Sequence, residues 1–483
     1  FNNLRYFCPV LRYDRLSNDE GVVEVRYQRG VSFNSQEKLG AARTQFENVI
    51  NNPRANKYQQ IRALLQISSA CSSEGKTDCA EEFASKAITL AKEERMENIA
   101  TNGLINLGNA FLARGEYDKA EQNFQQGLDF ARKDEGFRNE ARALLTLGSL
   151  RIQQKKPDEA QSFVNQALSF FQKGGYNKEV SQANLILGRA SEMKEDYDAA
   201  LQAFQQVENS ETAPVADKAY AKMVNGNVLK HQEKYPKALR ILEQSYDLYQ
   251  SLNNPFYTTY TLFYLSHILF QLGRFEEAKD KLFKAQAILK KGDSLYPQLS
   301  TETHLLNARI ALSGRNFTEA IKEAKQDSLS KDPSVASDAN MIIGLAQTSS
   351  NPKNPEGIKK CIEALENAVS TKDTRAINTT KLALAEAYLN TGNYSDALET
   401  ALQSKNYFIT AGQLESGWRA LVLAGKAKQQ KGDGENARIY ATNALEILHQ
   451  LQSDWGQEHF NNYLSKPDNN LYFKQAQGLS KSE

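Results

Sequence analysis

Apolar residues recur three and four positions apart along most of the chain, in short stretches that polar turns interrupt. In residues 103–128, Leu104, Leu107 and Phe111 share one apolar face, and Phe124 belongs to a second face that follows a Gly-Glu turn. This spacing predicts two short helices joined by a tight turn. Neither helix is expected to be stable alone, because its apolar flank needs a neighbouring hairpin to cover it.

The same hairpin pattern recurs with a period near forty residues. A small residue faces inward on the first helix, and an Ala opens the inner face of the second helix about twelve residues later. The pairs are Gly30/Ala42, Ser68/Ala80, Gly108/Ala120, Gly148/Ala160, Gly188/Ala200, Gly226/Ala238, Ser266/Ala278, Ala308/Ala320, a degraded Gly344/Gly357, Ala385/Ala397 and Gly425/Ala437. Such a repeat predicts a solenoid, which presents a long surface rather than one catalytic pocket.

This residue pattern resembles the tetratricopeptide repeat family. Asn106-Leu107-Gly108-Asn109-Ala110-Phe111, followed by Gly115-Glu116-Tyr117-Asp118-Lys119-Ala120 and Phe124, matches nearly every position of the family's helix-turn-helix unit. The resemblance implies an all-α fold, a right-handed α-solenoid superhelix of about eleven such units. Most periods here are longer than the commoner thirty-four residues. The long variant is similar to repeats of kinesin light chain, of cell-polarity adaptors and of bacterial signalling proteins, all of which bind other proteins.

We expect three parts: an arm over residues 1–21, the repeat array over residues 22–450, and a capping helix and tail over residues 451–483. The arm is expected either to cover the first hairpin or to dock on a neighbouring molecule. In the tail, Trp455, Phe460 and Leu464 are expected to cover the last hairpin, with Pro467 stopping the helix. This tail resembles the endings of bacterial repeat regions that follow a serine/threonine kinase domain.

The amino-acid composition limits the kinds of partner that the chain can be expected to bind. With 59 Lys and Arg against 58 Asp and Glu, the net charge of +1 supplies no field for nucleic acid or an anionic membrane. No apolar run approaches the length of a membrane span. Since the chain begins at Phe1 without an initiator Met, we expect a processed form or a fragment, and the compartment, cytoplasmic or extracytoplasmic, stays open.

The sequence shows no catalytic, cofactor-binding or metal-binding signature. GxGxxG, GxxxxGK[ST], GxSxG and HExxH are all missing, and the five His and four Cys have no metal-ligand spacing. We therefore expect no enzyme activity, no cofactor and no metal. Cys71 and Cys79 face each other across one predicted hairpin, so they are either a disulfide or two buried thiols.

The family resemblance implies that the first helix of each hairpin lines a concave groove. The second, fifth, sixth, ninth and twelfth or thirteenth helix positions would project into it. Counted from the small residues, the candidates are Arg62, Asn102, Asn106, Asn109, Arg142, Arg189, Tyr220, Asn227, Lys230, His231, Tyr260, Tyr264, His267, Phe270 and Arg309. Asn can pair with a peptide backbone and Arg with a carboxylate, although the aromatic residues could equally be packing between helices. The family's clamp for a terminal carboxylate is not assembled, because Arg142 and Arg189 stand where lysines are expected.

We interpret the chain as a non-catalytic scaffold that binds partner proteins or peptides in its groove, as a sensory or scaffolding region of a bacterial signalling protein. One alternative is self-assembly into filaments through the arm and the solenoid ends. A second is a regulatory module of a larger enzyme such as a serine/threonine kinase.

Overall fold

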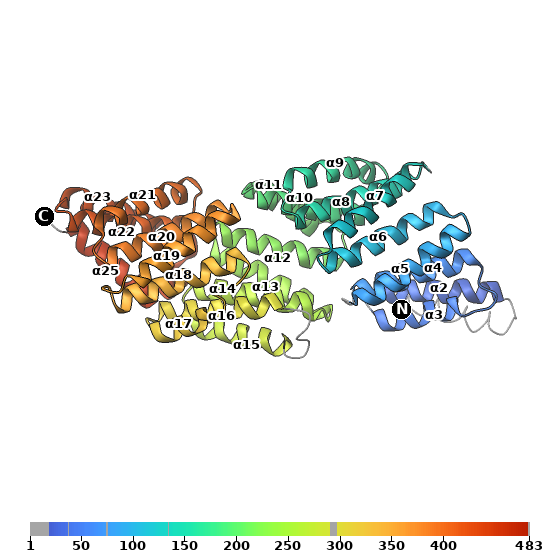
Figure 1. Cartoon of the computed structure of the whole chain (residues 1–483), viewed down its shortest axis with the longest axis horizontal. Helices are drawn as coiled ribbons and strands as arrows, with labels where there is room; N and C mark the ends of the chain where they lie inside the picture. The colour runs from blue at the N-terminus through green and yellow to red at the C-terminus, as the bar shows by residue number, and fades with distance from the viewer. Residues whose placement is uncertain (1–18, 37, 74–75, 134, 290–296, 482–483) are drawn as a thin grey trace. The chain divides into compact units, whose positions relative to one another are not determined.

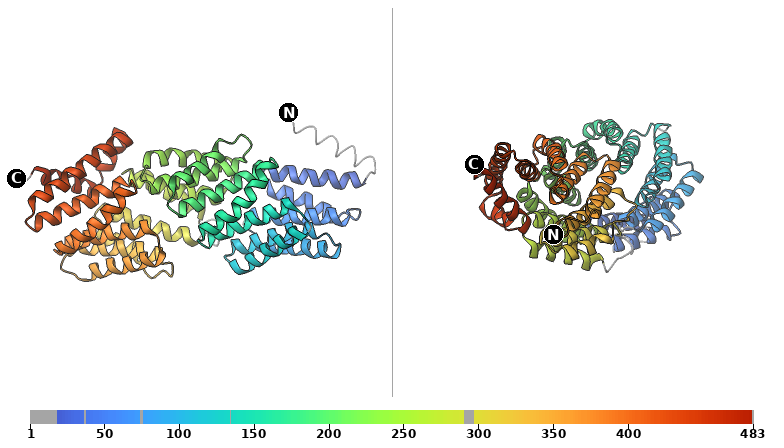
Figure 2. Two further views of the ribbon diagram at one scale, coloured as in Figure 1. Left: turned by 90° about the horizontal axis from the view of Figure 1, so that it is seen from above. Right: turned by 60° about the vertical axis from the view of Figure 1, so that its left-hand side comes forward.

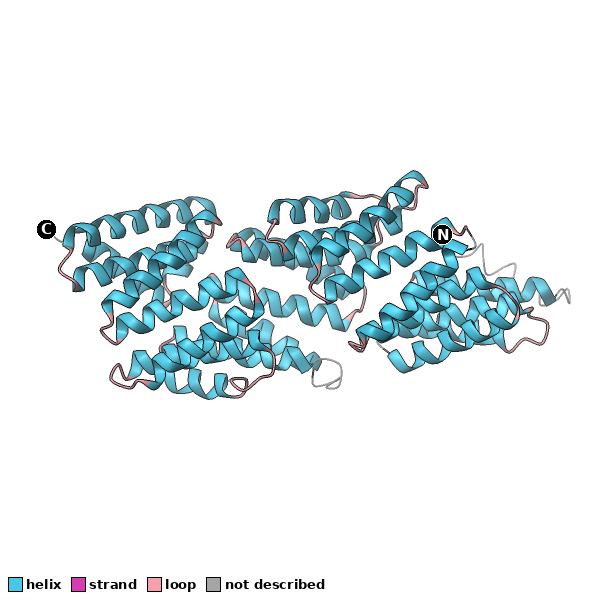
Figure 3. Cartoon of the chain, turned by 45° about the horizontal axis from the view of Figure 1, so that its top comes forward, coloured by secondary structure: helices cyan, strands magenta, loops and turns pink. Residues whose placement is uncertain are grey.

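A computed structural model describes residues 19–36, 38–73, 76–133, 135–289 and 297–481 of the chain. All regular structure in these residues is helical and none of it is strand, which confirms the all-α repeat fold (Figure 3). The chain divides into an amino-terminal unit of residues 1–221 and a carboxy-terminal unit of residues 222–483. Of the predicted arm, residues 1–18 lie outside the described residues.

Within each unit, successive helices form pairs that pack against each other and against the next pair (Figures 1 and 2). In the amino-terminal unit the pairs are α2 (Asp19–Ser35) with α3 (Leu39–Ile50), α4 (Lys57–Ser73) with α5 (Thr77–Glu93), α6 (Glu97–Ala113) with α7 (Tyr117–Lys133), α8 (Phe137–Gln153) with α9 (Pro157–Lys173), and α10 (Asn177–Met193) with α11 (Tyr197–Asn209). The division between the units falls within α12 (Val215–His231).

The carboxy-terminal unit continues the same pairing. α13 (Tyr235–Ser251) follows α12, and then come α14 (Pro255–Gln271) with α15 (Phe275–Leu289), α16 (Pro297–Ser313) with α17 (Phe317–Lys325), α18 (Pro333–Ser350) with α19 (Glu356–Thr371), α20 (Thr374–Asn390) with α21 (Tyr394–Thr410), and α22 (Leu414–Gln430) with α23 (Gly434–Trp455). Two further helices end the chain, α24 (Gln457–Leu464) and α25 (Pro467–Lys481).

Within a pair, the small residue of the first helix faces the residue sixteen positions later on the second. A Cβ atom added to Gly108 would lie 2.6 Å from Cδ1 of Phe124, so only glycine leaves room for this ring. Where the first residue is Ser or Ala instead, the facing residue is Ala in three repeats: Ser68/Ala84, Ala308/Ala324 and Ala385/Ala401. All six of these facing side chains are fully buried. In these three repeats a larger first residue is thus matched by a smaller facing residue.

The turn after each first helix also repeats. Seven residues beyond the small residue, the backbone turns left-handed, at Gly115, Lys155, Glu195, Glu233, Gly273, Arg315, Gly392 and Gly432. A residue in this conformation ends a helix by satisfying its last carbonyl groups. The repeat at Gly344 differs, because Asn351 in the corresponding position has φ −143° and a loop containing two prolines follows.

The pair that the sequence marks as degraded, Gly344/Gly357, is in fact in very close contact. A Cβ on Gly344 would lie 2.6 Å from the carbonyl oxygen of Gly357 and 2.9 Å from the backbone nitrogen of Cys361. A Cβ on Gly357 would in turn lie 2.7 Å from Cγ2 and 3.0 Å from the backbone nitrogen of Thr348, so glycine stands in place of Ala because the two helices approach so closely here. The irregularity is confined to the turn.

The tail differs from the expectation in how it covers the last repeat. Pro467 does not stop a helix but is the first residue of α25, a position that suits its fixed φ. α25 packs on α22 and α23, where Leu479 joins Ala437 and Ala441 in one apolar cluster. Trp455 and Phe460 are each 6% exposed; Trp455 meets Tyr235 of α13 and Tyr463 edge-on, and Phe460 lies beside Tyr463. The boundary expected at residue 451 falls inside α23.

Candidate functional site

The carboxy-terminal unit encloses a cavity of about 590 Å³. The first helices of its consecutive repeats line it, namely α12, α14, α16, α18, α20 and α22, together with the connection between α24 and α25. Six candidate groove residues from the sequence meet here: Asn227, Lys230, Tyr260, Tyr264, His267 and Arg309. His231 and Phe270 line it as well. The structure therefore brings eight of the fifteen candidates around one space.

A count along the helix accounts for most of these residues. The small residue of each first helix faces its own second helix, and residues six, three and two positions before it and one after it share a neighbouring face, which holds Asn227, Tyr260, Tyr264, His267 and Arg309. The same offsets from Gly344, Ala385 and Gly425 give further lining residues, which the sequence analysis missed because it stopped at Arg309: Asp338, Met341, Ile342, Leu345, Thr379, Leu382, Ala383, Glu386 and Arg419.

A contact between distant parts of the carboxy-terminal unit closes one wall of the cavity. The side-chain nitrogen of Gln413 donates to the backbone oxygen of His231 at 3.0 Å. Next to it, the Glu233 carboxylate accepts hydrogen bonds from the backbone nitrogen of Ser416, at 3.1 Å, and from its hydroxyl. These partners lie more than 180 residues apart in the sequence. No local pattern in the sequence marks them as neighbours.

The connection between α24 and α25 forms a second wall. Ser313 at the end of α16 donates to Oδ1 of Asp468 at 2.8 Å. Gly273, in its left-handed turn, approaches Asn462 so closely that a Cβ would lie 2.7 Å from the Asn462 carbonyl carbon. Nζ of Lys466 lies 4.6 Å from the ring centroid of Phe270. The tail thus contributes to the cavity as well as covering the last repeat.

A buried polar network supports these walls from behind. The indole nitrogen of Trp418 donates to the Tyr463 hydroxyl at 2.8 Å, and this hydroxyl donates to Oε1 of Glu415 at 2.9 Å. Arg419 lies 3.8 Å from the same Glu415 oxygen and 3.7 Å from Oδ2 of Asp468. Such a chain of satisfied groups holds the wall in one arrangement.

Burial determines which titratable side chains around the cavity carry a charge. Burial, and then the neighbouring Glu415 carboxylate, raise the pKa of Glu233 to about 8, so it is mostly protonated at neutral pH. Burial and the cations Arg309 and Lys230 lower the pKa of His267 well below its usual value, so this imidazole is neutral. The charged lining residues are Lys230, Arg309, Arg315, Arg375, Arg419 and Lys466 against Asp338, Glu386, Glu415 and Asp468. Positive charge is in excess.

Aromatic side chains occupy one side of the cavity. The ring of Phe263 meets the imidazole of His267 edge-on with centroids 4.6 Å apart, and Nζ of Lys230 lies 5.2 Å from the Tyr264 centroid. Phe263 and Phe270 are buried, while Tyr260 and Tyr264 are only half-buried. Packing describes the phenylalanines, and the tyrosines also pack, Tyr260 against Phe256 and Tyr264 against Phe263, while part of each tyrosine stays exposed.

The other seven candidates belong to the amino-terminal unit and do not line this cavity. Most of them join successive first helices. Arg62 lies 4.0 Å above the Tyr27 ring, Asn106 donates to the Leu65 carbonyl at 3.1 Å, Arg142 donates to Asn102 at 2.7 Å, and Arg189 donates to the Tyr220 hydroxyl at 2.9 Å. Asn109 is half-buried on α6. These contacts hold neighbouring repeats together along their inner face.

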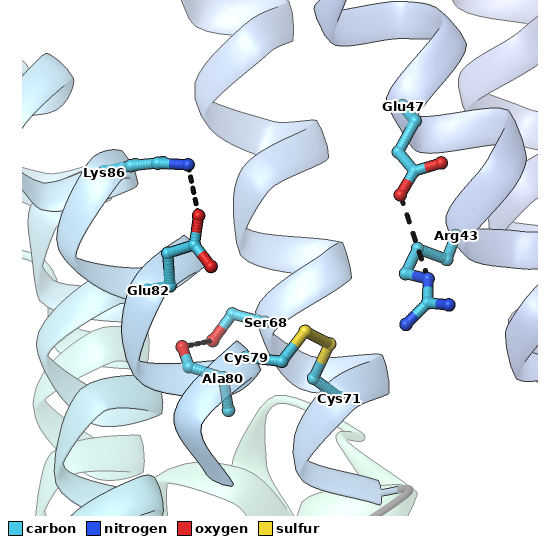
Figure 4. Close-up of a disulfide and its surroundings, with 8 residues drawn as sticks. All are labelled: Arg43, Glu47, Ser68, Cys71, Cys79, Ala80, Glu82 and Lys86. Carbon is cyan, nitrogen blue, oxygen red and sulfur yellow. Dashed lines mark hydrogen bonds and ion pairs between the residues drawn. A yellow bond between two sulfur atoms is a disulfide. The ribbon is translucent and has the colours of Figure 1, made fainter. Parts of the chain in front are cut away.

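Cys71 and Cys79 are bonded to each other in the structure, with Cα atoms 5.8 Å apart (Figure 4). The bond connects the end of α4 to the start of α5, beside the Ser68 hydroxyl that donates to the Ala80 carbonyl. Across the residues that the structure describes, no three His, Cys, Asp or Glu side chains are grouped as a metal site. In the same residues, no helix combines the length and apolar character needed to cross a membrane.

A tetratricopeptide repeat family model matches residues 97–173 and 218–291, so these segments are tetratricopeptide repeats. No curated protein matches the chain. Among solved structures, the apo form of the quorum sensor NprR from B. thuringiensis is 14% identical with a TM-score of 0.45, covering 77% of this chain and 99% of its own. RapI in its apo form is 14% identical with a TM-score of 0.43, covering 56% and 99%. Yeast Tom70 is 12% identical with a TM-score of 0.37, covering 96% of both chains.

Proposed function

We propose that the chain is a non-catalytic binding protein that takes up a peptide, or an extended segment of a partner protein, in the cavity of residues 222–483. The observation that supports this proposal is the convergence of equivalent positions from six successive first helices on one space. Amide, aromatic and charged side chains alternate there with apolar ones, as in sites that bind and orient a ligand.

The chemistry of the lining suits a polypeptide ligand. Asn227 offers a side-chain amide, which can both donate to and accept from a peptide backbone. Tyr260 and Tyr264 provide flat, amphipathic surfaces for apolar side chains. The guanidinium of Arg309, although paired with Asp338 at 2.6 Å, remains at the cavity wall. Charged and aromatic groups at spaced positions would select among sequences.

Binding of a defined peptide library tests the proposal. The full chain would be immobilised and exposed to random heptapeptides, and the retained peptides would be identified and their affinities measured by calorimetry. Asn227→Ala and Tyr264→Ala should each weaken the retained peptides about tenfold or more, because each removes one anchor. Asn109→Ala, a half-buried change on an equivalent helix outside the cavity, is the matched control and should leave affinity unchanged. Equal effects of all three variants would refute this location.

A finer proposal concerns the biological setting. We propose that the chain serves as a sensory or scaffolding region of a bacterial signalling protein, or as the regulatory module of an attached enzyme. The long repeat period and the resemblance of the tail to kinase-associated repeat regions support it. Sequencing the full reading frame from the native source, and assaying any attached catalytic domain with and without a retained peptide, tests it. An attached enzyme whose rate ignores the peptide would contradict regulation.

Self-assembly receives less support from the structure. The filament alternative requires apolar surface around Trp455 for contact with another molecule, yet Trp455 and Phe460 are each only 6% exposed. Tyr235 and Tyr463 of the same chain cover the Trp455 ring. Light scattering at rising concentration, with the intact chain and with residues 1–18 removed, measures whether the arm alone drives association.

A further inference from the structure

Lys466 is a buried cation without an anionic partner. It follows α24, is 1% exposed and lines the cavity. Its ammonium lies 4.6 Å from the Phe270 ring centroid and 5.7 Å from that of Tyr463. Throughout the described part of the chain, no side-chain or backbone oxygen forms a hydrogen bond or ion pair with this ammonium. Since an ammonium has three donors, and a buried charge is costly when unpaired, this side chain lacks a partner of its own.

The nearby carboxylates have other partners. Asp468 accepts from the Ser313 hydroxyl at 2.8 Å and lies 3.7 Å from Arg419. Glu415 accepts from the Tyr463 hydroxyl at 2.9 Å and also pairs with Arg419. Both acids act on Lys466 electrostatically, although Oδ1 of Asp468 and Oε1 of Glu415 accept hydrogen bonds from other groups. The aromatic rings beside the ammonium offer it only their faces.

We propose that Lys466 binds a carboxylate of the ligand inside the cavity, which makes the ligand an acidic peptide or one with a free carboxyl terminus. This inference rests on the proposed function, because it assigns one subsite of the same cavity. The excess of cations over anions in the lining favours such a ligand. Burial lowers the pKa of the lysine, and an incoming carboxylate would offset that cost by pairing with it.

The subsite comes from the tail and not from a repeat. Ser313 and Gly273, at the ends of two successive first helices, fix the segment that carries Lys466. Its position therefore depends on the closed arrangement of the carboxy-terminal unit. A lysine in this place is unlike the groove positions of the repeats, since it lies outside the repeating pattern altogether.

Four peptide pools test the proposal against the full chain. The pools are random heptapeptides with a free or amidated carboxyl terminus, and with or without Asp and Glu among their residues. Retention of each pool is measured for wild type and for Lys466→Met, Lys466→Arg and Lys474→Met. Lys474 is an exposed lysine on α25, the helix that begins directly after Lys466, so its variant is a matched control for lost charge. Thermal melts of all variants accompany the binding assay.

The expected result is that pools with a carboxylate bind wild type at least ten times better than the amidated pool without acids. Lys466→Met should abolish this preference, Lys466→Arg should retain most of it, and Lys474→Met should leave it intact. The acidic-amidated and neutral-free pools distinguish a side-chain carboxylate from a terminal one. Lys466→Met should melt no lower than wild type, because it removes an unpaired buried charge.

The experiment distinguishes failure of the Lys466 assignment from failure of the proposed function. If peptides bind wild type without preference for a carboxylate, or if Lys466→Met keeps the preference, the Lys466 assignment is overturned while peptide binding stands. If no pool binds wild type, the proposed function and this inference are both overturned. A marked fall in the Lys466→Met melting temperature, together with unchanged selectivity in Lys466→Arg and in Lys466→Met, would assign the lysine a structural role.

Discussion

The matched volumes at Gly108 and Phe124 lead to a quantitative prediction. Substituting Gly108→Ala places a methyl group 2.6 Å from Cδ1 of a fully buried ring, where the backbones of α6 and α7 leave little space to shift. Overpacking of this kind costs about 1–3 kcal/mol. Phe124→Ala alone removes the ring and should cost about 3–5 kcal/mol, because it leaves a cavity between the two helices.

The double variant, with Gly108→Ala and Phe124→Ala together, should lose less unfolding free energy than the two single variants lose in total. Ala385 facing Ala401 is the combination that the double variant creates, and both of these alanines are fully buried in the structure. The methyl group introduced by Gly108→Ala would partly fill the space left by the Phe124 ring. We expect a favourable coupling of about 1–3 kcal/mol, within the range found for residues in contact.

The assay must report on one repeat, since a long repeat array does not unfold in a single step. Hydrogen exchange followed by mass spectrometry gives the opening free energy of α6 and α7, with α20 and α21 as an internal reference. Gly478→Ala in α25 is the control for a helical glycine whose added Cβ meets no atom within 4 Å. It should stabilise that helix by up to about 1 kcal/mol. The argument is refuted if the changes in opening free energy caused by Gly108→Ala and Phe124→Ala simply add in the double variant, or if Gly108→Ala is as stable as wild type.

Three further predictions concern other regions. In the folded chain the pKa of Glu233 is raised to about 8, whereas its pKa in the unfolded chain is near 4.5. The protonated Glu233 side chain therefore contributes its full stabilisation of the fold below pH 4.5, and this stabilisation is lost as the pH rises through 8. Glu233→Gln should therefore flatten the fall in melting temperature between pH 5 and 9, and an unchanged or steeper fall would contradict the buried pair with Glu415. In denaturant, labelling by a thiol reagent, located by mass spectrometry, should reach Cys71 and Cys79 only after reduction, because they are bonded to each other; labelling of either one without reduction would disprove the bond. The Arg151 side chain is nearly buried and pairs with two glutamates, Glu121 and Glu159, each at 2.6 Å. Arg151→Met should therefore lower the opening free energy of α8, measured by hydrogen exchange, by about 1–3 kcal/mol. An unchanged opening free energy would show that the two ion pairs contribute nothing.

Much of the fold could be predicted from the sequence because each hairpin depends on local information. The apolar spacing around Leu104 and Phe124 is helical, and the small residue at Gly108 marks where two helices approach. The family model and the all-helical structure confirm this assignment. The candidate residues from Asn227 to Arg309 could be found for the same reason, since a helix places equal offsets on one face.

The Gly344/Gly357 repeat shows where this local argument fails. Only Gly357 departs from the pattern, by standing where other repeats have Ala, so in the sequence alone it looks like decay. Whether a missing Cβ weakens or tightens a contact depends on how closely the facing backbone approaches, and that is a property of both helices together. Pro467 was misjudged similarly, because a proline can end one helix or begin the next.

The sequence by itself therefore determined the helices, the hairpins, their repeat and the residues that each first helix turns inward, because all of these follow from contacts within about forty residues. Only the tertiary structure decided that the carboxy-terminal unit closes on itself. That closure joins Gln413 and Ser416 to the turn at Glu233 and brings Lys466 to the cavity wall. Small rotations between successive repeats add up over the stack, and no single residue pattern records their sum.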